Sequence, residues 1–126
     1  MRCRSPSLKR LYLGYCNSLT KEVVNEFLRN CPLLEELTLV GCETVVYHAL
    51  YDQINGETCP QLKRLELRTY ASRPPGCGYD ERLPAVATVH SLQHLILDSI
   101  DINNNELSAI VDGCPHLELL DVSECY

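Results

Sequence analysis

Tryptophan is absent from this sequence of 126 residues, and aromatic side chains make up only 6% of it. Phe27 is the single phenylalanine, and seven tyrosines supply the other aromatic rings. A hydrophobic core must therefore rest mainly on leucine, valine, isoleucine and cysteine. Because apolar residues reach 45% and charged residues 22%, the composition is that of a globular domain and is too apolar for a disordered chain.

Long apolar runs, an excess of positive charge and glycosylation sequons are also missing. No stretch approaches the roughly 20 apolar residues of a membrane-spanning helix, and the first residues hold no apolar signal segment. The formal net charge of -6 disfavours binding to phosphate backbones, since that binding needs clustered lysine and arginine. We therefore expect an intracellular protein, in the cytoplasm and/or nucleus, with no nucleic-acid partner and no membrane.

Cysteine, by contrast, is abundant, and eight cysteines would suggest a disulfide framework in a small secreted protein. Their placement indicates packing instead. Cys31, Cys59 and Cys114 each directly precede a proline, whereas Cys16, Cys42 and Cys125 each close a leucine-rich run. Only Cys3 and Cys77 lie outside this pattern, and they are candidates for exposed thiols.

The cysteines belong to an internal repeat of the form Cys-Pro-x-Leu-x-x-Leu-x-apolar-x-x-Cys. It is clearest at residues 31–42 and 114–125, and altered copies occupy residues 5–16, 59–70 and 89–100. The first leucines of the five copies are Leu8, Leu34, Leu62, Leu92 and Leu117, so the intervals are 26, 28, 30 and 25 residues. The long third interval contains residues 69–78, where prolines and glycines predict a surface loop.

Each copy predicts a short strand, because its last two apolar residues are two positions apart and share one face. Helical spacing follows between the copies. Thr20 is a candidate N-cap for a helix through Leu28, and Asn103–Asn105 precede another through Val111. A less regular apolar stripe covers residues 45–54, and a further helix is expected at about residues 80–89, with Pro84 in its first turn.

Each copy is expected to form a strand, a turn and a helix that returns the chain to the edge where the strand began. Repeated in this way, the strands all run in the same direction and form a parallel sheet. The predicted fold is α/β: a curved leucine-rich-repeat solenoid, or horseshoe, of about five repeats. Its parallel sheet should line the concave side, its helices the convex side, and stacked leucines the space between them.

The repeat resembles the cysteine-containing class of leucine-rich repeats found mainly in F-box proteins, and the ending DGCPHLELLDVSECY is similar to plant F-box/LRR proteins of the Skp1-interacting type. The resemblance implies that the F-box docks on Skp1 in a cullin-based (SCF-type) E3 ubiquitin ligase, while the repeats recruit the substrate for ubiquitination and degradation. It also implies that Cys16, Cys42 and Cys125 are buried structural residues.

One departure from that family concerns the F-box itself. The chain begins seven residues before Leu8, which leaves no room for such a segment. We expect residues 1–126 to form one leucine-rich-repeat domain, either as a fragment of a full F-box protein or as a repeat-only scaffold or decoy without ligase association. Skp1 and cullin are partners only if an F-box exists outside this chain.

Catalytic, cofactor and metal sites are not predicted. His90 and His94 have His-x3-His spacing, but they straddle the start of a strand rather than one helix face. Cys77 lies between two glycines, and no residue can be assigned from sequence to activate it. Phosphate-binding glycine motifs are absent, so we expect a binding protein and no enzyme.

The candidate binding surface is the face of the strands opposite the leucines, where we expect a protein substrate to dock. Its predicted residues are Arg10, Tyr12, Glu36, Thr38, Arg64, Glu66, Arg68, His94, Ile96, Asp98, Leu119 and Asp121. Arginine and aromatic side chains are common anchors of protein interfaces.

Overall fold

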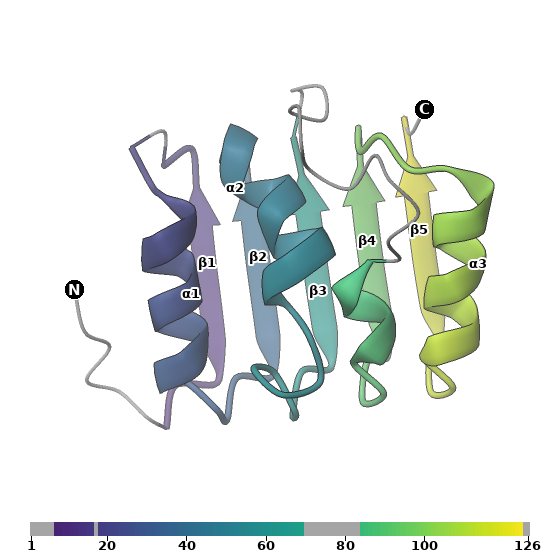
Figure 1. Cartoon of the computed structure of the whole chain (residues 1–126), viewed down its shortest axis with the longest axis horizontal. Helices are drawn as coiled ribbons and strands as arrows, with labels where there is room; N and C mark the ends of the chain where they lie inside the picture. Colours follow the sequence, from purple (N-terminus) through teal and green to yellow (C-terminus); the bar gives the residue numbers. More distant parts are fainter. Residues whose placement is uncertain (1–6, 17, 70–83, 125–126) are drawn as a thin grey trace.

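The computed structural model describes residues 7–16, 18–69 and 84–124. The predicted loop beyond Thr69 and the cysteines Cys3, Cys77 and Cys125 lie outside these residues. Five strands form one parallel sheet in the order β1-β2-β3-β4-β5 (Figure 1). They are β1 (Arg10–Gly14), β2 (Glu36–Val40), β3 (Arg64–Arg68), β4 (His94–Asp98) and β5 (Leu119–Ser123).

The strand register reproduces the repeat alignment without a shift. Leu37 of β2 pairs with Leu11 on one side and Leu65 on the other, and the ladder continues through Leu95 to Leu120. Because alternate residues share a face, this register places the leucines of every copy on one side of the sheet. The predicted parallel strands are therefore confirmed in both position and pairing.

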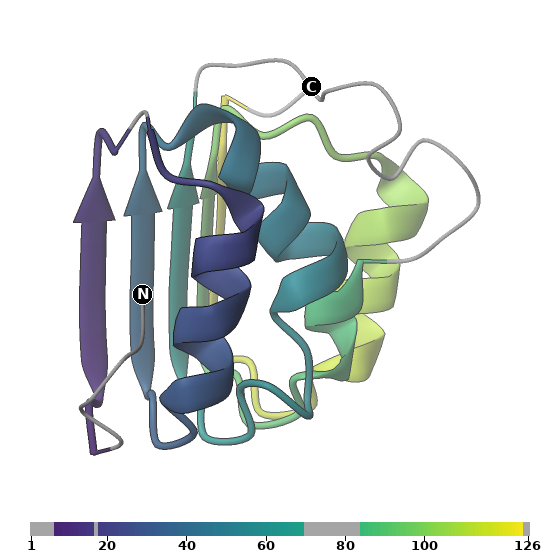
Figure 2. The same cartoon turned by 60° about the vertical axis from the view of Figure 1, so that its left-hand side comes forward.

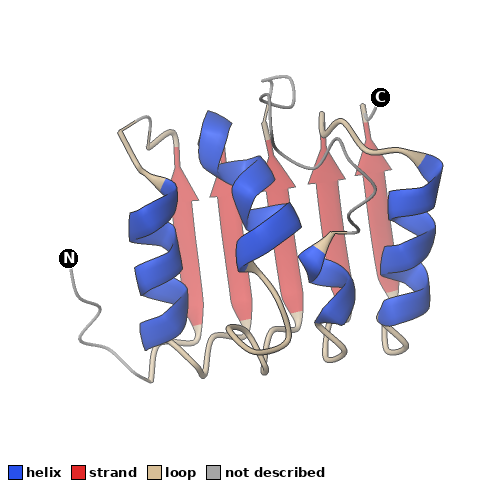
Figure 3. Ribbon diagram, in the orientation of Figure 1, coloured by secondary structure: helices blue, strands red, loops and turns tan. Residues whose placement is uncertain are grey.

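In the part of the chain that the structure describes, the helices all cover that leucine-bearing side and leave the other side of the sheet open (Figures 2 and 3). In chain order they are α1 (Lys21–Asn30), α2 (Glu43–His48) with the π-helical turn η1 (Ala49–Gln53), the 3-10 turn η2 (Ala85–Thr88) and α3 (Asn104–Gly113). The result is a two-layer, mixed α/β fold with a parallel sheet, compatible with a leucine-rich-repeat arrangement. Among the described residues, no helix has the length and apolar character of a membrane span.

The core lies between the two layers and is deepest at the three central strands. Leu39, Leu67 and Leu97 are fully buried, whereas Leu13 and Val122, their counterparts in β1 and β5, are half-buried. A central strand has neighbours on both sides and an outer strand has only one. Burial of each leucine stabilises the fold by roughly 1.5–3 kcal/mol relative to an exposed position.

The repeat cysteines act as packing residues. Cys31, Cys42, Cys59 and Cys114 are buried, Cys16 is half-buried, and none of the five takes part in a disulfide bond. The Cys42 thiol donates to the carbonyl oxygens of Leu13 and Val40, both at 3.6 Å. Burial raises the pKa of Cys59 to about 11, so its thiolate, the nucleophilic form, is suppressed.

Capping residues fix the starts of the two longest described helices, and the predicted N-cap Thr20 is confirmed. The Thr20 hydroxyl accepts the amide of Val23 at 3.3 Å, and Asn103 forms a capping box with Glu106. Each cap satisfies an amide that has no partner within the helix.

Two helical segments differ from the sequence prediction. The described end of the helix expected at residues 80–89 is only the single 3-10 turn η2, because Pro84 is extended at ψ 132° and cannot serve as a helical residue. The stripe at residues 45–54 is helical, but it changes to π geometry at Ala49. Tyr47, fully buried in α2, accepts the amide of Asp101 at 2.9 Å and so holds the turn after β4.

Candidate functional site

The uncovered side of the sheet, here called the open face, consists of three rows of side chains that run across the strands. All twelve residues predicted from sequence lie on these strands at alternate positions, and the register aligns them with one another. The first row is Arg10, Glu36, Arg64, His94 and Leu119. The second row is Tyr12, Thr38, Glu66, Ile96 and Asp121, and the third is Gly14, Val40, Arg68, Asp98 and Ser123.

A chain of ion pairs, the central network, joins four charged side chains of β3 and β4. Glu66 accepts from Arg64 Nη2 at 2.7 Å and from Arg68 Nε at 2.5 Å. Arg68 Nη1 also contacts Asp98 Oδ2 at 2.5 Å. Two positive and two negative charges therefore neutralise one another at the middle of the open face.

This network shifts the pKa values of its members. Burial alone would raise the pKa of Glu66, but the hydrogen bonds and charges of Arg68 and Arg64 outweigh it and lower the pKa below its ordinary value. Glu66 in turn raises the pKa of Arg68 above the usual arginine value. Both shifts favour the charged forms.

Exposure along the open face is uneven. Thr38 and Ile96 are only 9% and 8% exposed because their second-row positions on central strands have neighbours on every side. Tyr12 and Leu119, on the outer strands, are 66% and 47% exposed. A partner that approaches the open face meets these two side chains more readily than the two central ones.

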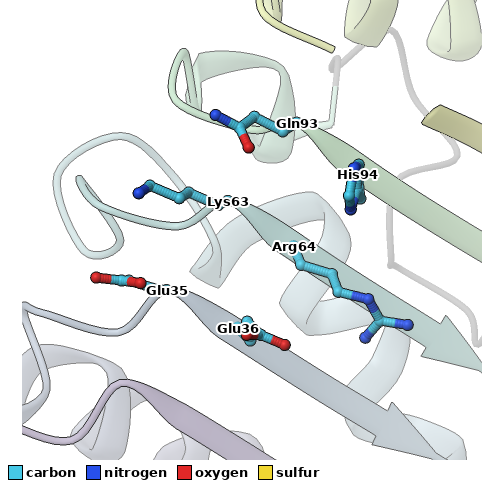
Figure 4. A pocket seen from close by; sticks show the side chains of 6 residues that line it. All are labelled: Glu35, Glu36, Lys63, Arg64, Gln93 and His94. Carbon is cyan, nitrogen blue, oxygen red and sulfur yellow. The ribbon is translucent and has the colours of Figure 1, made fainter. Parts of the chain in front are cut away.

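The first row continues into a groove where the central strands begin. This strand-start groove has a volume of about 400 Å³ and is lined by Glu35, Glu36, Lys63, Arg64, Gln93 and His94 (Figure 4). Glu35, Lys63 and Gln93 each immediately precede a strand. Sequence reasoning missed these three as binding residues because it considered only positions inside the strands.

Backbone hydrogen bonds fix the three missed positions. The Glu35 amide donates to the Lys9 carbonyl at 2.7 Å, and the Lys63 amide donates to the Glu35 carbonyl at 2.8 Å. In the next repeat, the Gln93 amide donates to the Lys63 carbonyl at 2.8 Å. A polar residue occurs at this repeat position in every copy, and that periodicity was the signal that could have identified the groove from sequence.

The two histidines with metal-like spacing have different surroundings. His90 Nδ1 lies 2.8 Å from the Gly113 carbonyl at the end of α3, whereas His94 lines the groove on the open face. In the described ranges, no group of three or more His, Cys, Asp or Glu side chains is arranged to hold a metal ion. The catalytic hypothesis for Cys77 concerns a residue outside those ranges.

Comparison with known proteins finds relatives among plant F-box proteins. The chain is 36% identical over 129 residues to "Putative F-box/LRR-repeat protein 23" of Arabidopsis thaliana, an alignment covering 98% of this chain and 27% of the relative. It is 37% identical over 123 residues to "Putative F-box/LRR-repeat protein 22" of the same plant, covering 98% of this chain and 38% of the relative. "F-box protein SKIP19" is 31% identical over 123 residues, again with 98% and 38% covered.

The chain thus spans well under half the length of these curated relatives. No protein-family model matches the sequence, and no solved structure gives a significant match.

Proposed function

We propose that this chain, which belongs to the plant F-box/LRR-repeat proteins, binds another protein through the open face of its sheet. The observation that carries the proposal is the asymmetry of the two sheet sides. Helices cover the leucine side, while the other side presents fixed rows of charged, polar and apolar side chains. Repeat arrays commonly use such extended strand surfaces for docking.

In this proposal, the chain is the substrate-recognition part of an SCF-type E3 ubiquitin ligase and acts in protein ubiquitination and degradation. Skp1 and cullin would be reached through an F-box outside residues 1–126. The curved solenoid, with the open face as its concave side, belongs to the same proposal, as does a location in the cytoplasm and/or nucleus. The alternative is a repeat-only scaffold or decoy that binds a partner without any ligase.

The module would supply recognition and no chemistry. Burial raises the pKa of the Cys42, Cys59 and Cys114 thiols, which makes them poor nucleophiles. No cofactor is needed for the proposed role.

Affinity capture from plant cells with paired variants tests the role of the open face. The face variant combines Tyr12→Ser with Asp121→Lys, because both side chains are exposed on that face. Its control combines Arg29→Ser in α1 with Asp112→Lys in α3, which are exposed on the helical layer. We expect the face variant to lose the captured target and the control to keep it; retention by both variants would contradict the proposal.

The same capture, made with the protein expressed from its own gene rather than with residues 1–126 alone, separates the ligase from its alternative. Recovery of Skp1 and cullin with both variants supports the substrate receptor, since an F-box outside these residues would bind them independently of the open face. Recovery of the target without Skp1 and cullin would support the scaffold or decoy.

A further inference from the structure

We infer that the partner is held at the strand-start groove rather than at the centre of the open face, and that the groove takes an extended peptide segment carrying a basic and an acidic side chain two residues apart. The inference rests on the proposed function and adds the place and the chemistry of recognition.

The centre of the open face offers few charges to a partner. Within the central network, Glu66 is already bonded to Arg64 and Arg68, and Arg68 also contacts Asp98. A partner would have to break or desolvate these ion pairs. The free energy lost by doing so exceeds the free energy gained on binding unless every charged group finds a new partner. Thr38 and Ile96, beside the network, are almost fully buried.

Two charged side chains of the groove, Glu35 and Lys63, are still available to a partner, whereas Glu36 and Arg64 are already paired with Arg10 and Glu66. Among the described residues, no hydrogen bond or ion pair engages the side chains of Glu35, Lys63 or Gln93, and Lys63 is exposed. Their backbone positions are fixed by the ladder of amide bonds to the preceding repeat. Groups presented on a fixed backbone lose less conformational freedom when a partner binds.

The order of charges across the groove determines what fits it. Glu35 and Glu36 lie at the start of β2, Lys63 and Arg64 at the start of β3, and Gln93 and His94 at the start of β4 (Figure 4). A complementary segment carries a basic side chain over β2 and a carboxylate over β3. Like-charge contacts would disfavour the reverse placement.

The spacing of the strands favours an extended segment that crosses them. Adjacent strands are about 4.8 Å apart, and side chains two residues apart on one face of an extended peptide are roughly 6.6 Å apart. Long lysine, arginine and glutamate side chains can span the difference. A groove of about 400 Å³ is large enough for a few side chains and too small for a folded domain.

Selection from a displayed library of random twelve-residue peptides tests the inference. We expect wild-type protein to enrich peptides in which Lys or Arg stands two residues from Asp or Glu. Synthetic copies of the enriched peptides should bind Lys63→Glu at least tenfold more weakly than wild type, because the reversed charge repels the peptide carboxylate. Lys21→Glu, an exposed lysine on α1, is the matched control and should bind them as wild type does.

Each outcome of this selection decides the inference. Failure to enrich any peptide, absence of the paired charges, or equal binding by Lys63→Glu would overturn it. If the peptides instead lose affinity for the variant with Tyr12→Ser and Asp121→Lys, the proposed function stands and only the groove is wrong. If the peptides bind Lys63→Glu and the variant with Tyr12→Ser and Asp121→Lys as tightly as wild type, the proposal that the open face binds a partner also loses its support. Thermal melts confirm that Lys63→Glu and the less drastic Lys63→Gln remain folded.

Discussion

At the scale of single residues, two leucines of the same repeat have opposite environments. Leu37 points into the core and is 1% exposed, whereas Leu33, four residues earlier, is 44% exposed. We predict that Leu37→Ala lowers the free energy of unfolding by about 2–5 kcal/mol, because it leaves a cavity. Leu33→Ala should change it by less than about 0.5 kcal/mol. Urea unfolding measures both, and similar losses for the two variants would contradict the packing described here.

Glu66 makes the stability of the fold depend on pH. Its pKa is lowered from the ordinary 4.5, so the carboxylate stabilises the folded state above that pH, and the contribution is lost as the pH falls through the lowered folded-state pKa. We predict that Glu66→Gln costs about 1.5–3 kcal/mol at pH 7, as expected for a hydrogen bond to a charged group. The difference from wild type should shrink below a pH of about 4.5.

Glu36→Gln is the control for that measurement. Its partner Arg10 has an 81% exposed side chain, and exposed ion pairs contribute only about 0–1 kcal/mol. A gap between wild type and Glu66→Gln that stays constant down to pH 2 would show that the carboxylate charge is not what stabilises the network.

At the scale of elements, four of the five strands end in a shared backbone conformation. The residues that follow β1, β2, β4 and β5 have φ angles of 57°, 67°, 59° and 55°, and they are Tyr15, Gly41, Ser99 and Glu124. This left-handed conformation turns the chain away from the sheet, and it costs roughly 1–2 kcal/mol for a residue with a Cβ. Only Gly41 avoids that cost.

We therefore predict that Gly41→Ala destabilises the protein by at least about 1 kcal/mol. A Cβ at Gly41 would also lie 2.5 Å from Cδ1 of the Tyr15 ring. Ser99→Ala should cost less than about 0.5 kcal/mol, because Ser99 already carries a Cβ in the same conformation. Thermal melts compare the two substitutions, and equal losses would argue against a special role for glycine here.

The elements differ in how far sequence could predict them. The period-two leucines predicted every strand and its register, because a shift of one residue would turn the whole apolar set to the open face. Thr20 predicted the start of one helix, and the polar run Asn103–Asn105 indicated the start of another, for an equally local reason. The helix expected at residues 80–89 was wrong in its described part, because Pro84 takes an extended rather than a helical conformation. The change to π geometry at Ala49 was not predicted, since the apolar stripe at residues 45–54 indicates a helix without indicating its type.

The candidate site was predicted in position but not in energetics. Alternation alone placed all twelve open-face residues on their strands. It could not show that Arg68 reaches Asp98 on the next strand, 30 residues away, or that Ile96 is buried by its neighbours. Reversing both Arg64 and Arg68 would surround Glu66 with negative charge, so that change would test the fold as much as the binding.

At the scale of the whole molecule, the repeat cysteines form part of one continuous core. Cys31, Cys42, Cys59 and Cys114 are each at most 2% exposed, and none of the four is in a disulfide bond. We predict that iodoacetamide at neutral pH modifies them slowly in the folded protein and rapidly in urea, while the half-buried Cys16 reacts earlier. Peptide mass spectrometry assigns each site. Rapid native modification of Cys59, or a disulfide that joins any of the four, would contradict this packing.

We propose that a partner binds the open face of the sheet, whereas the leucine and cysteine core lies on the opposite side. A titration of ¹⁵N-labelled protein with its captured target, followed by amide chemical shifts, tests it most directly. We predict that the largest changes occur at Lys63, Arg64 and His94 and that α1 is unaffected. Changes concentrated on α1 and α3, with the strand starts unchanged, would contradict it.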